Sequence, residues 1–98
     1  LTKEDITTAV CLYYKIPFEK VFLRLRKREV VKARQISMYL SKLFITSESL
    51  KSIGDFFGGR DHTTVIHSCQ TVKDLMDTDP VFKGEILILQ ETVERLRT

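Results

Sequence analysis

The sequence predicts a single all-α domain of about six helices, and three observations support this. Proline occurs only at Pro17 and Pro80 and glycine at four positions, so few residues interrupt regular structure. Apolar side chains recur between them at three- and four-residue spacing, which is the period of an amphipathic helix. The 98 residues, 43% hydrophobic and 30% charged, suffice for one modest core. We therefore expect residues 1–98 to form one soluble domain.

Two long helices and a short turn of helix are expected in the first half of the chain. Thr2 and Asp5 have the spacing of a capping box, so a first helix begins there and ends before Pro17. Residues 18–23 are expected to form the short turn, and a second long helix covers about residues 29–44. The expected buried stripe of this second helix comprises Ala33, Ile36, Leu40, Leu43 and Phe44, with Tyr39 alongside.

Three further helices are expected in the second half. Residues 50–57 form a short helix, and Gly58-Gly59 ends it because glycine allows the positive φ that a sharp reversal needs. Asp61 is a good N-cap for a helix over about residues 61–76. Pro80 takes the first position of the last helix. The apolar face of that helix is expected to comprise Ile86, Leu89, Val93 and Leu96.

Positive charge is concentrated in one part of the chain. Residues 1–72 contain twelve Lys and Arg but seven Asp and Glu, a net charge of +5, whereas residues 73–98 carry −2. Six cations fall within residues 24–34, a density typical of a phosphate-binding surface, although a solvated charged face explains it equally well on charge alone. The cations that we expect to contact backbone phosphates of a bound partner include Arg24, Lys27, Arg28 and Lys32.

Residues 50–67 have the pattern of a helix-turn-helix, namely a short helix, a glycine turn and a longer helix. In such motifs the first residues of the second helix meet base edges in the major groove. Threonine hydroxyls bond base edges and their methyl groups suit thymine, while Asp61 accepts from cytosine or only caps the helix. The pattern predicts sequence-specific binding to double-stranded DNA, against the plainer interpretation of polar surface residues on a helical turn. The expected base-reading residues are Asp61, His62, Thr63 and Thr64, with His67 one turn later at the DNA backbone.

The segment FGGRDHTTVIH at residues 57–67 resembles the signature of the C-terminal DNA-binding domain of the bacterial replication initiator DnaA. The resemblance continues in YYKI at 13–16, ARQISMYL at 33–40, SLxxIG at 49–54 and TDPxF at 78–82, so it covers nearly the whole chain. It implies a fold similar to the Trp-repressor helix-turn-helix. It also implies binding to short asymmetric DnaA boxes at the replication origin, helping to initiate chromosomal replication.

The resemblance also implies contacts outside the recognition helix. Arg26, in the basic loop, takes the place of the family's arginine that enters the minor groove. Gln35 and Lys42 match family residues of the second long helix that lie by the DNA. Arg60, directly before the major-groove readers, is expected to contact a phosphate or a base.

The chain departs from the family in two places. Leu25 and Glu29 interrupt a loop that is more purely basic in relatives, and the loop at 45–49 is about one residue longer than in some of them. These departures affect the expected geometry of the minor-groove contact and leave the expected fold unchanged.

We expect no enzymatic activity, no metal and no cofactor. The sequence contains no GxxxxGK[ST] motif, so an ATPase module would lie outside this chain. His62 and His67 are five residues apart and diverge by roughly 140° on a helix, so they do not share a face as metal ligands would. Cys11 and Cys69 lack a CxxC spacing and are expected to be buried, reduced thiols.

The expected partner is double-stranded DNA, bound by a monomeric domain without membrane insertion. Apolar runs reach four or five residues and no secretory signal is visible, which favours a cytoplasmic, nucleoid-associated protein. The chain begins at Leu1, which suggests a domain of a longer initiator that contacts other copies through domains absent here.

Alternative functions remain open. One is a stand-alone DnaA-like transcriptional regulator or anti-initiator, and another is a protein-interaction module with a solvated basic face. A stacking platform for single strands is disfavoured because the aromatic residues have the helical spacing of core positions: Tyr13, Tyr14, Phe18, Phe22 and Tyr39.

Overall fold

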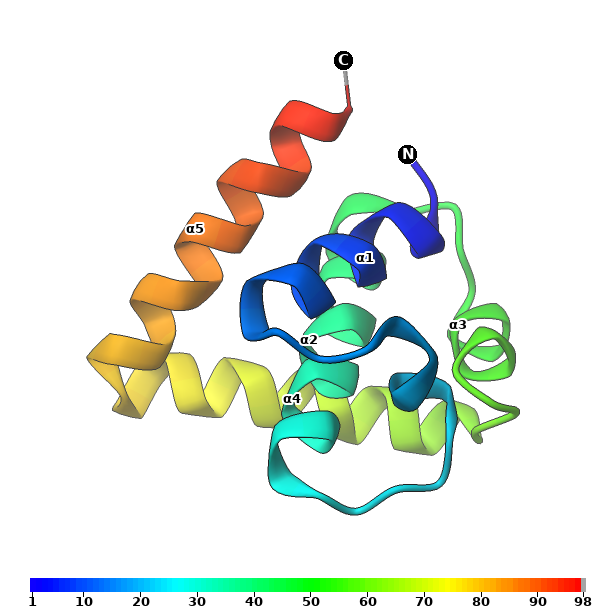
Figure 1. Cartoon of the computed structure of the whole chain (residues 1–98). Coiled ribbons are helices and arrows are strands. Elements are labelled where there is room, and N and C mark those ends of the chain that lie inside the picture. The colour runs from blue at the N-terminus through cyan, green and yellow to red at the C-terminus, as the bar shows by residue number, and fades with distance from the viewer. Residues whose placement is uncertain (98) are drawn as a thin grey trace.

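The computed structural model describes residues 1–97, which contain five α-helices, one 3-10 helix and no strand (Figure 1). The all-α expectation with about six helices is therefore confirmed. The central helix is α2, which packs against α1, η1, α3 and α4. The last helix, α5, packs mainly against α1 and α4. The elements span Lys3–Tyr14 (α1), Phe18–Phe22 (the 3-10 helix η1), Arg28–Phe44 (α2), Leu50–Phe56 (α3), His62–Thr78 (α4) and Pro80–Leu96 (α5).

Local signals set the helix ends where the sequence predicted them. The hydroxyl of Thr2 accepts from the Asp5 backbone N–H at 3.1 Å, and the Asp5 carboxylate accepts from the Thr2 N–H at 3.0 Å, which completes the capping box of α1. Lys15 adopts a left-handed φ of 58° and ends this helix two residues before Pro17. Asp79 caps α5, whose first residue is Pro80.

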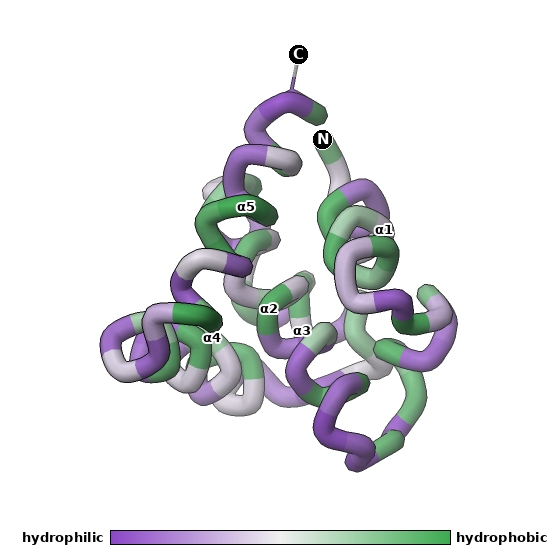
Figure 2. The backbone as a smooth tube through the Cα atoms, turned by 60° about the vertical axis from the view of Figure 1, so that its left-hand side comes forward, coloured by the Kyte–Doolittle hydropathy of each residue, from purple (hydrophilic) through white to green (hydrophobic). Residues whose placement is uncertain are grey.

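The buried core is drawn from all five helices and from η1. In Figure 2, hydrophobic and hydrophilic residues alternate along the helices, as amphipathic packing requires. Two expected core residues are exposed instead: Leu43 retains 46% and Leu96 47% of its accessible surface. Both lie in the last turn of their helix and line open surface grooves, so neighbouring helices do not cover them.

The two cysteines are free thiols in different surroundings. Cys11 is buried as expected, and this burial raises its pKa to about 11, with Glu19 adding to the effect. Cys69 is only half-buried, which corrects the expectation that both thiols are fully covered. Among residues 1–97, no helix is long and apolar enough to cross a membrane.

Candidate nucleic-acid interface

The start of α4 carries the residues predicted to read bases in the major groove, and all of them are exposed. Asp61 caps the helix, because its Oδ1 accepts from the Thr63 backbone N–H at 3.2 Å. The same oxygen lies 2.9 Å from Nδ1 of His62. Val65, one position beyond Thr64, is fully buried and anchors the turn to the core. The structure thus brings the four predicted readers together on one exposed turn, with exposed His67 one turn later.

The connection from α3 to α4 is tight because glycine allows a close backbone approach. Gly58 and Gly59 adopt φ values of +91° and +73°, as the sequence predicted. The Arg60 N–H donates to the carbonyl oxygen of Gly54 at 2.8 Å. A Cβ built on Gly54 would lie only 2.1 Å from the Arg60 carbonyl oxygen, so α3 could not approach the turn with any larger residue there.

The basic loop, defined here as residues 23–27 between η1 and α2, has no regular secondary structure. Its cations Arg24, Arg26 and Lys27 are exposed, as is Arg28 at the start of α2. Arg34, a buried arginine of α2, holds the loop in place through hydrogen bonds to backbone carbonyls. Its Nε donates to the Val21 carbonyl at 2.8 Å, and its Nη2 donates to the carbonyls of Leu23 and Leu25 at 2.8 and 3.3 Å.

Arg34 belongs to the basic cluster in the sequence but is 6% exposed in the structure. Burial lowers its pKa to about 10, and the positive charge of Arg60 adds to this effect. Sequence reasoning counted Arg34 as one more surface cation and missed its role. The available signal was its position between Ala33 and Ile36, inside the predicted buried stripe.

Arg60 also directs its guanidinium toward the protein. Nε donates to the Phe57 carbonyl at 2.9 Å, and Nη2 donates to the Leu23 carbonyl at 3.1 Å. Burial lowers the pKa of Arg60, with Arg24 contributing a smaller electrostatic part. The residue expected to contact DNA directly therefore connects the helix-turn-helix to the basic loop.

The predicted contact residues of α2 lie along one side of that helix. Arg28, Gln35 and Lys42 are seven residues apart, which is nearly two turns, so they form one stripe. Lys32 is engaged differently: its ammonium lies 3.3 Å from the Glu85 carboxylate and over the Tyr14 ring at 4.8 Å. The Lys32 ammonium is thus already paired with a carboxylate of α5, which weakens its case as a phosphate contact.

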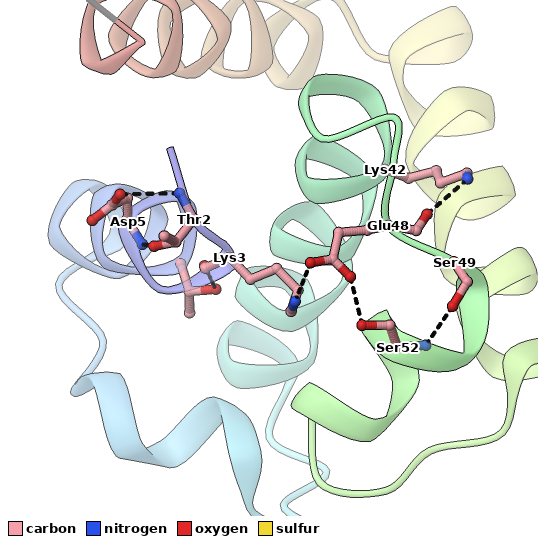
Figure 3. Close-up of polar contacts among 8 residues, drawn as sticks. Thr2, Lys3, Asp5, Lys42, Glu48, Ser49 and Ser52 are labelled. Atoms are coloured by element: carbon pink, nitrogen blue, oxygen red, sulfur yellow. Dashed lines mark hydrogen bonds and ion pairs between the residues drawn. The ribbon is translucent and has the colours of Figure 1, made fainter.

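A polar network connects the loop at 45–49 to α1, α2 and α3 (Figure 3). Glu48 pairs with Lys3 of α1 at 2.6 Å and accepts from the Ser52 hydroxyl of α3, while its carbonyl oxygen accepts from Lys42 at 3.1 Å. The hydrogen bond from Lys3 lowers the pKa of the Glu48 carboxyl, followed by that from Ser52. The network fixes the start of α3, where Ser49 supplies the N-cap.

The exposed recognition turn, the glycine-linked helix pair and the adjacent basic loop define a helix-turn-helix domain of the nucleic-acid-binding class. Residues 3–72 match the family described as bacterial dnaA protein helix-turn-helix. The chain belongs to this family.

Similar proteins are chromosomal replication initiators. The chain is 39% identical over 95 residues to "Chromosomal replication initiator protein DnaA" of Bacteroides thetaiotaomicron, covering 97% of this chain and 20% of that protein. It is 42% identical over 97 residues to the protein of the same name from Synechococcus sp., covering 99% and 20%. The chain thus spans about a fifth of the length of these relatives.

A solved structure titled "Crystal structure of DNA replication initiation factor" has a similar fold, with a TM-score of 0.79 and 31% sequence identity. The match covers 92% of this chain and 27% of that chain. It agrees with the all-α helix-turn-helix architecture described above.

Proposed function

We propose that this chain is a sequence-specific, double-stranded-DNA-binding domain that recognises DnaA-box-type sites and so takes part in the initiation of chromosomal replication. The observation that carries the proposal is the first turn of α4, where the family segment Asp61–Thr64 is exposed, capped and linked to the basic loop by the hydrogen bond from Arg60 to Leu23. The named relatives are initiators, which favours this role over a stand-alone regulator.

The first turn of α4 and the basic loop contact different grooves of the DNA. His62, Thr63 and Thr64 read base edges in the major groove, since their side chains extend from the exposed N-terminal turn. Arg26 of the basic loop enters the neighbouring minor groove, where a guanidinium fits the negative potential of a narrow A·T segment. The remaining positions contact the DNA backbone and set its register: Arg24, Lys27, Arg28, Gln35, Lys42 and His67.

The domain itself acts by binding and not by catalysis. The chain covers about a fifth of the longer relatives, so an ATPase module and contacts with other copies would lie in parts of the protein that this chain does not cover. We propose that the protein works in the cytoplasm, where the chromosome is accessible. The supporting observation is the family membership.

The test measures affinity for two duplexes. One is selected from a random-sequence pool with the wild-type chain, and the other is a scrambled version of it. Thr63→Ala should cost about 1–3 kcal/mol on the selected duplex and leave binding to the scrambled duplex unchanged. Lys27→Ala, its matched control, should weaken binding to both equally, because phosphate contacts carry no sequence information. Equal affinity of the wild type for both duplexes would refute the proposed function.

Salt dependence provides a second measurement on the same duplexes. About four phosphate contacts predict that log K falls against log salt with a slope of about −3 to −4. A slope shallower than about −2 would mean that the basic loop does not lie on the DNA.

A further inference from the structure

The basic loop and the helix-turn-helix meet at a single backbone oxygen. The Leu23 carbonyl accepts from Nη2 of Arg34 at 2.8 Å and from Nη2 of Arg60 at 3.1 Å. One guanidinium comes from α2 and the other from the turn directly before α4. Two like charges converge on this oxygen, although the charge of Arg60 contributes to lowering the pKa of Arg34. We call residues 22–23 the loop root. It is thus attached both to α2 and to the turn before α4.

Apolar and steric contacts reinforce this attachment. The Phe22 ring stacks on Phe57 with centroids 5.8 Å apart and meets Phe56 edge-on at 5.2 Å. Gly58 lies so close to the preceding segment that a Cβ there would be 2.6 Å from the Phe22 carbonyl oxygen. Residues 22–23 are therefore fixed against the glycine turn by stacking, by close packing and by a hydrogen bond.

The loop beyond this root depends on the same arginines. Residues 24–27 lie outside the helices, and Arg34 reaches the carbonyls of Val21 and Leu25 on either side of Leu23. A lysine could not replace either arginine, because an ammonium on a flexible stem does not bridge several carbonyls in one plane. The position of Arg26 relative to α4 is therefore set by Arg34 and Arg60.

We propose that Arg34 and Arg60 are positioning residues that hold the basic loop at a fixed separation from the recognition helix, so that the domain accepts only DNA sites in which the two base-reading regions have one particular spacing. This inference rests on the proposed function. One inserted base pair moves the two regions apart by about 3.4 Å and rotates them by about 35°, because a helical turn contains about 10–10.5 base pairs. A loop fixed at its root cannot follow that change, whereas a freed loop can.

The experiment compares the selected duplex with one carrying a single extra base pair between the two reading regions. Repeating the selection with Arg26→Ala locates the region that the loop reads, because sequence preference disappears there. For the wild type, the insertion should weaken binding about 30-fold, which is the size of one good base-specific contact. For Arg60→Lys, the penalty should fall below about 5-fold, close to the value for Arg26→Ala.

Two features make this readout specific for positioning. A variant that merely lowers the folded fraction weakens binding to both duplexes equally, so it leaves the insertion penalty unchanged. Arg97→Lys, at the end of α5 with an ion pair to Glu94, is the matched control and should keep the wild-type penalty. Arg34→Lys and Arg60→Gln are measured in the same way, so the comparison survives if one variant does not fold.

The inference and the proposed function fail in different ways. If the wild type prefers the selected duplex but the folded Arg60 and Arg34 variants keep the full insertion penalty, the positioning role is overturned. If the wild type binds selected and scrambled duplexes alike, the proposed function fails instead.

Discussion

The basic loop and the first turn of α4 are both exposed and polar, yet they are held in place by different interactions. In α4, the N–H groups of Thr64 and Val65 donate to the Asp61 carbonyl, and the Asp61 side chain caps the turn. All these partners lie within four residues of one another. The basic loop has no such local pattern and takes its shape from Arg34 and Arg60, which are distant in sequence.

This difference shows how robust each segment is to change elsewhere. A helical turn with its own cap keeps its geometry as long as the helix exists. A loop supported by side chains from other elements moves when any of those supports is altered. Substitutions that disturb the junction at the glycine turn should therefore affect the loop first, and substitutions at the cap should affect α4 alone.

The largest effect is expected for Gly54→Ala, which disturbs the junction directly. Alanine normally stabilises a helix by about 0.5–1 kcal/mol relative to glycine. Here its Cβ would lie 2.1 Å from the Arg60 carbonyl oxygen, so the backbone of the turn must shift. We expect the free energy of unfolding in urea to fall by about 3 kcal/mol.

Gly84→Ala is the control for this prediction. Gly84 also lies in a helix, α5, but a Cβ there meets no atom within 4 Å. This variant should be more stable than the wild type by about 0.5–1 kcal/mol. If both alanine variants gain stability, the turn is not packed against α3 as described.

Gly58→Ala should cause the next largest loss of folding stability. Comparing it with Gly59→Ala distinguishes the cost of losing the close contact with Phe22 from the cost of a positive φ. Gly58 and Gly59 both adopt positive φ, so alanine costs about 1 kcal/mol at either position. Only Gly58 also lies against the Phe22 carbonyl oxygen. Thermal or urea unfolding should show a loss of about 2 kcal/mol for Gly58→Ala and about 1 kcal/mol for Gly59→Ala. Equal losses would mean that contact with the loop root contributes nothing.

The same distinction between local and distant support explains what the sequence could predict. The capping box, the glycine turn, the Asp61 cap and Pro80 at the start of α5 are encoded within a few residues, and all were predicted correctly. The recognition turn follows from these local signals, and its four predicted readers are all exposed. Their contacts with DNA remain predictions.

Interactions between distant residues were not predictable in this way. The pairing of Lys32 with Glu85, 53 residues away, depends on how α5 folds back, and the carbonyls that bind Arg34 and Arg60 have no side-chain signature in the sequence. Helical periodicity also placed Leu43 and Leu96 in the core, because a repeating pattern does not reveal where a neighbouring helix stops covering its surface.

Arg26→Lys tests whether the basic loop reads the minor groove. It should weaken binding to the selected duplex by about 1–2 kcal/mol. The charge is retained, but a lysine loses the planar hydrogen-bond geometry that suits a narrow minor groove. The loss should shrink when the A·T pairs in the region read by the loop are replaced by G·C, because the guanine amino group obstructs the floor of the minor groove. A variant that binds both duplexes like the wild type would leave Arg26 as a phosphate contact.

The smallest effect concerns Asp61, where capping and base reading are separable. Asp61→Ala removes the acceptor for the Thr63 N–H and should lower the free energy of unfolding by about 1 kcal/mol. Asp61→Ser keeps a capping oxygen and should restore wild-type stability, but its side chain is too short to reach a base or to pair with Nδ1 of His62. We therefore expect the serine variant to lose about 1 kcal/mol of affinity for the selected duplex at unchanged stability. If it instead binds as well as the wild type, Asp61 serves α4 only as a cap, and base reading begins at His62.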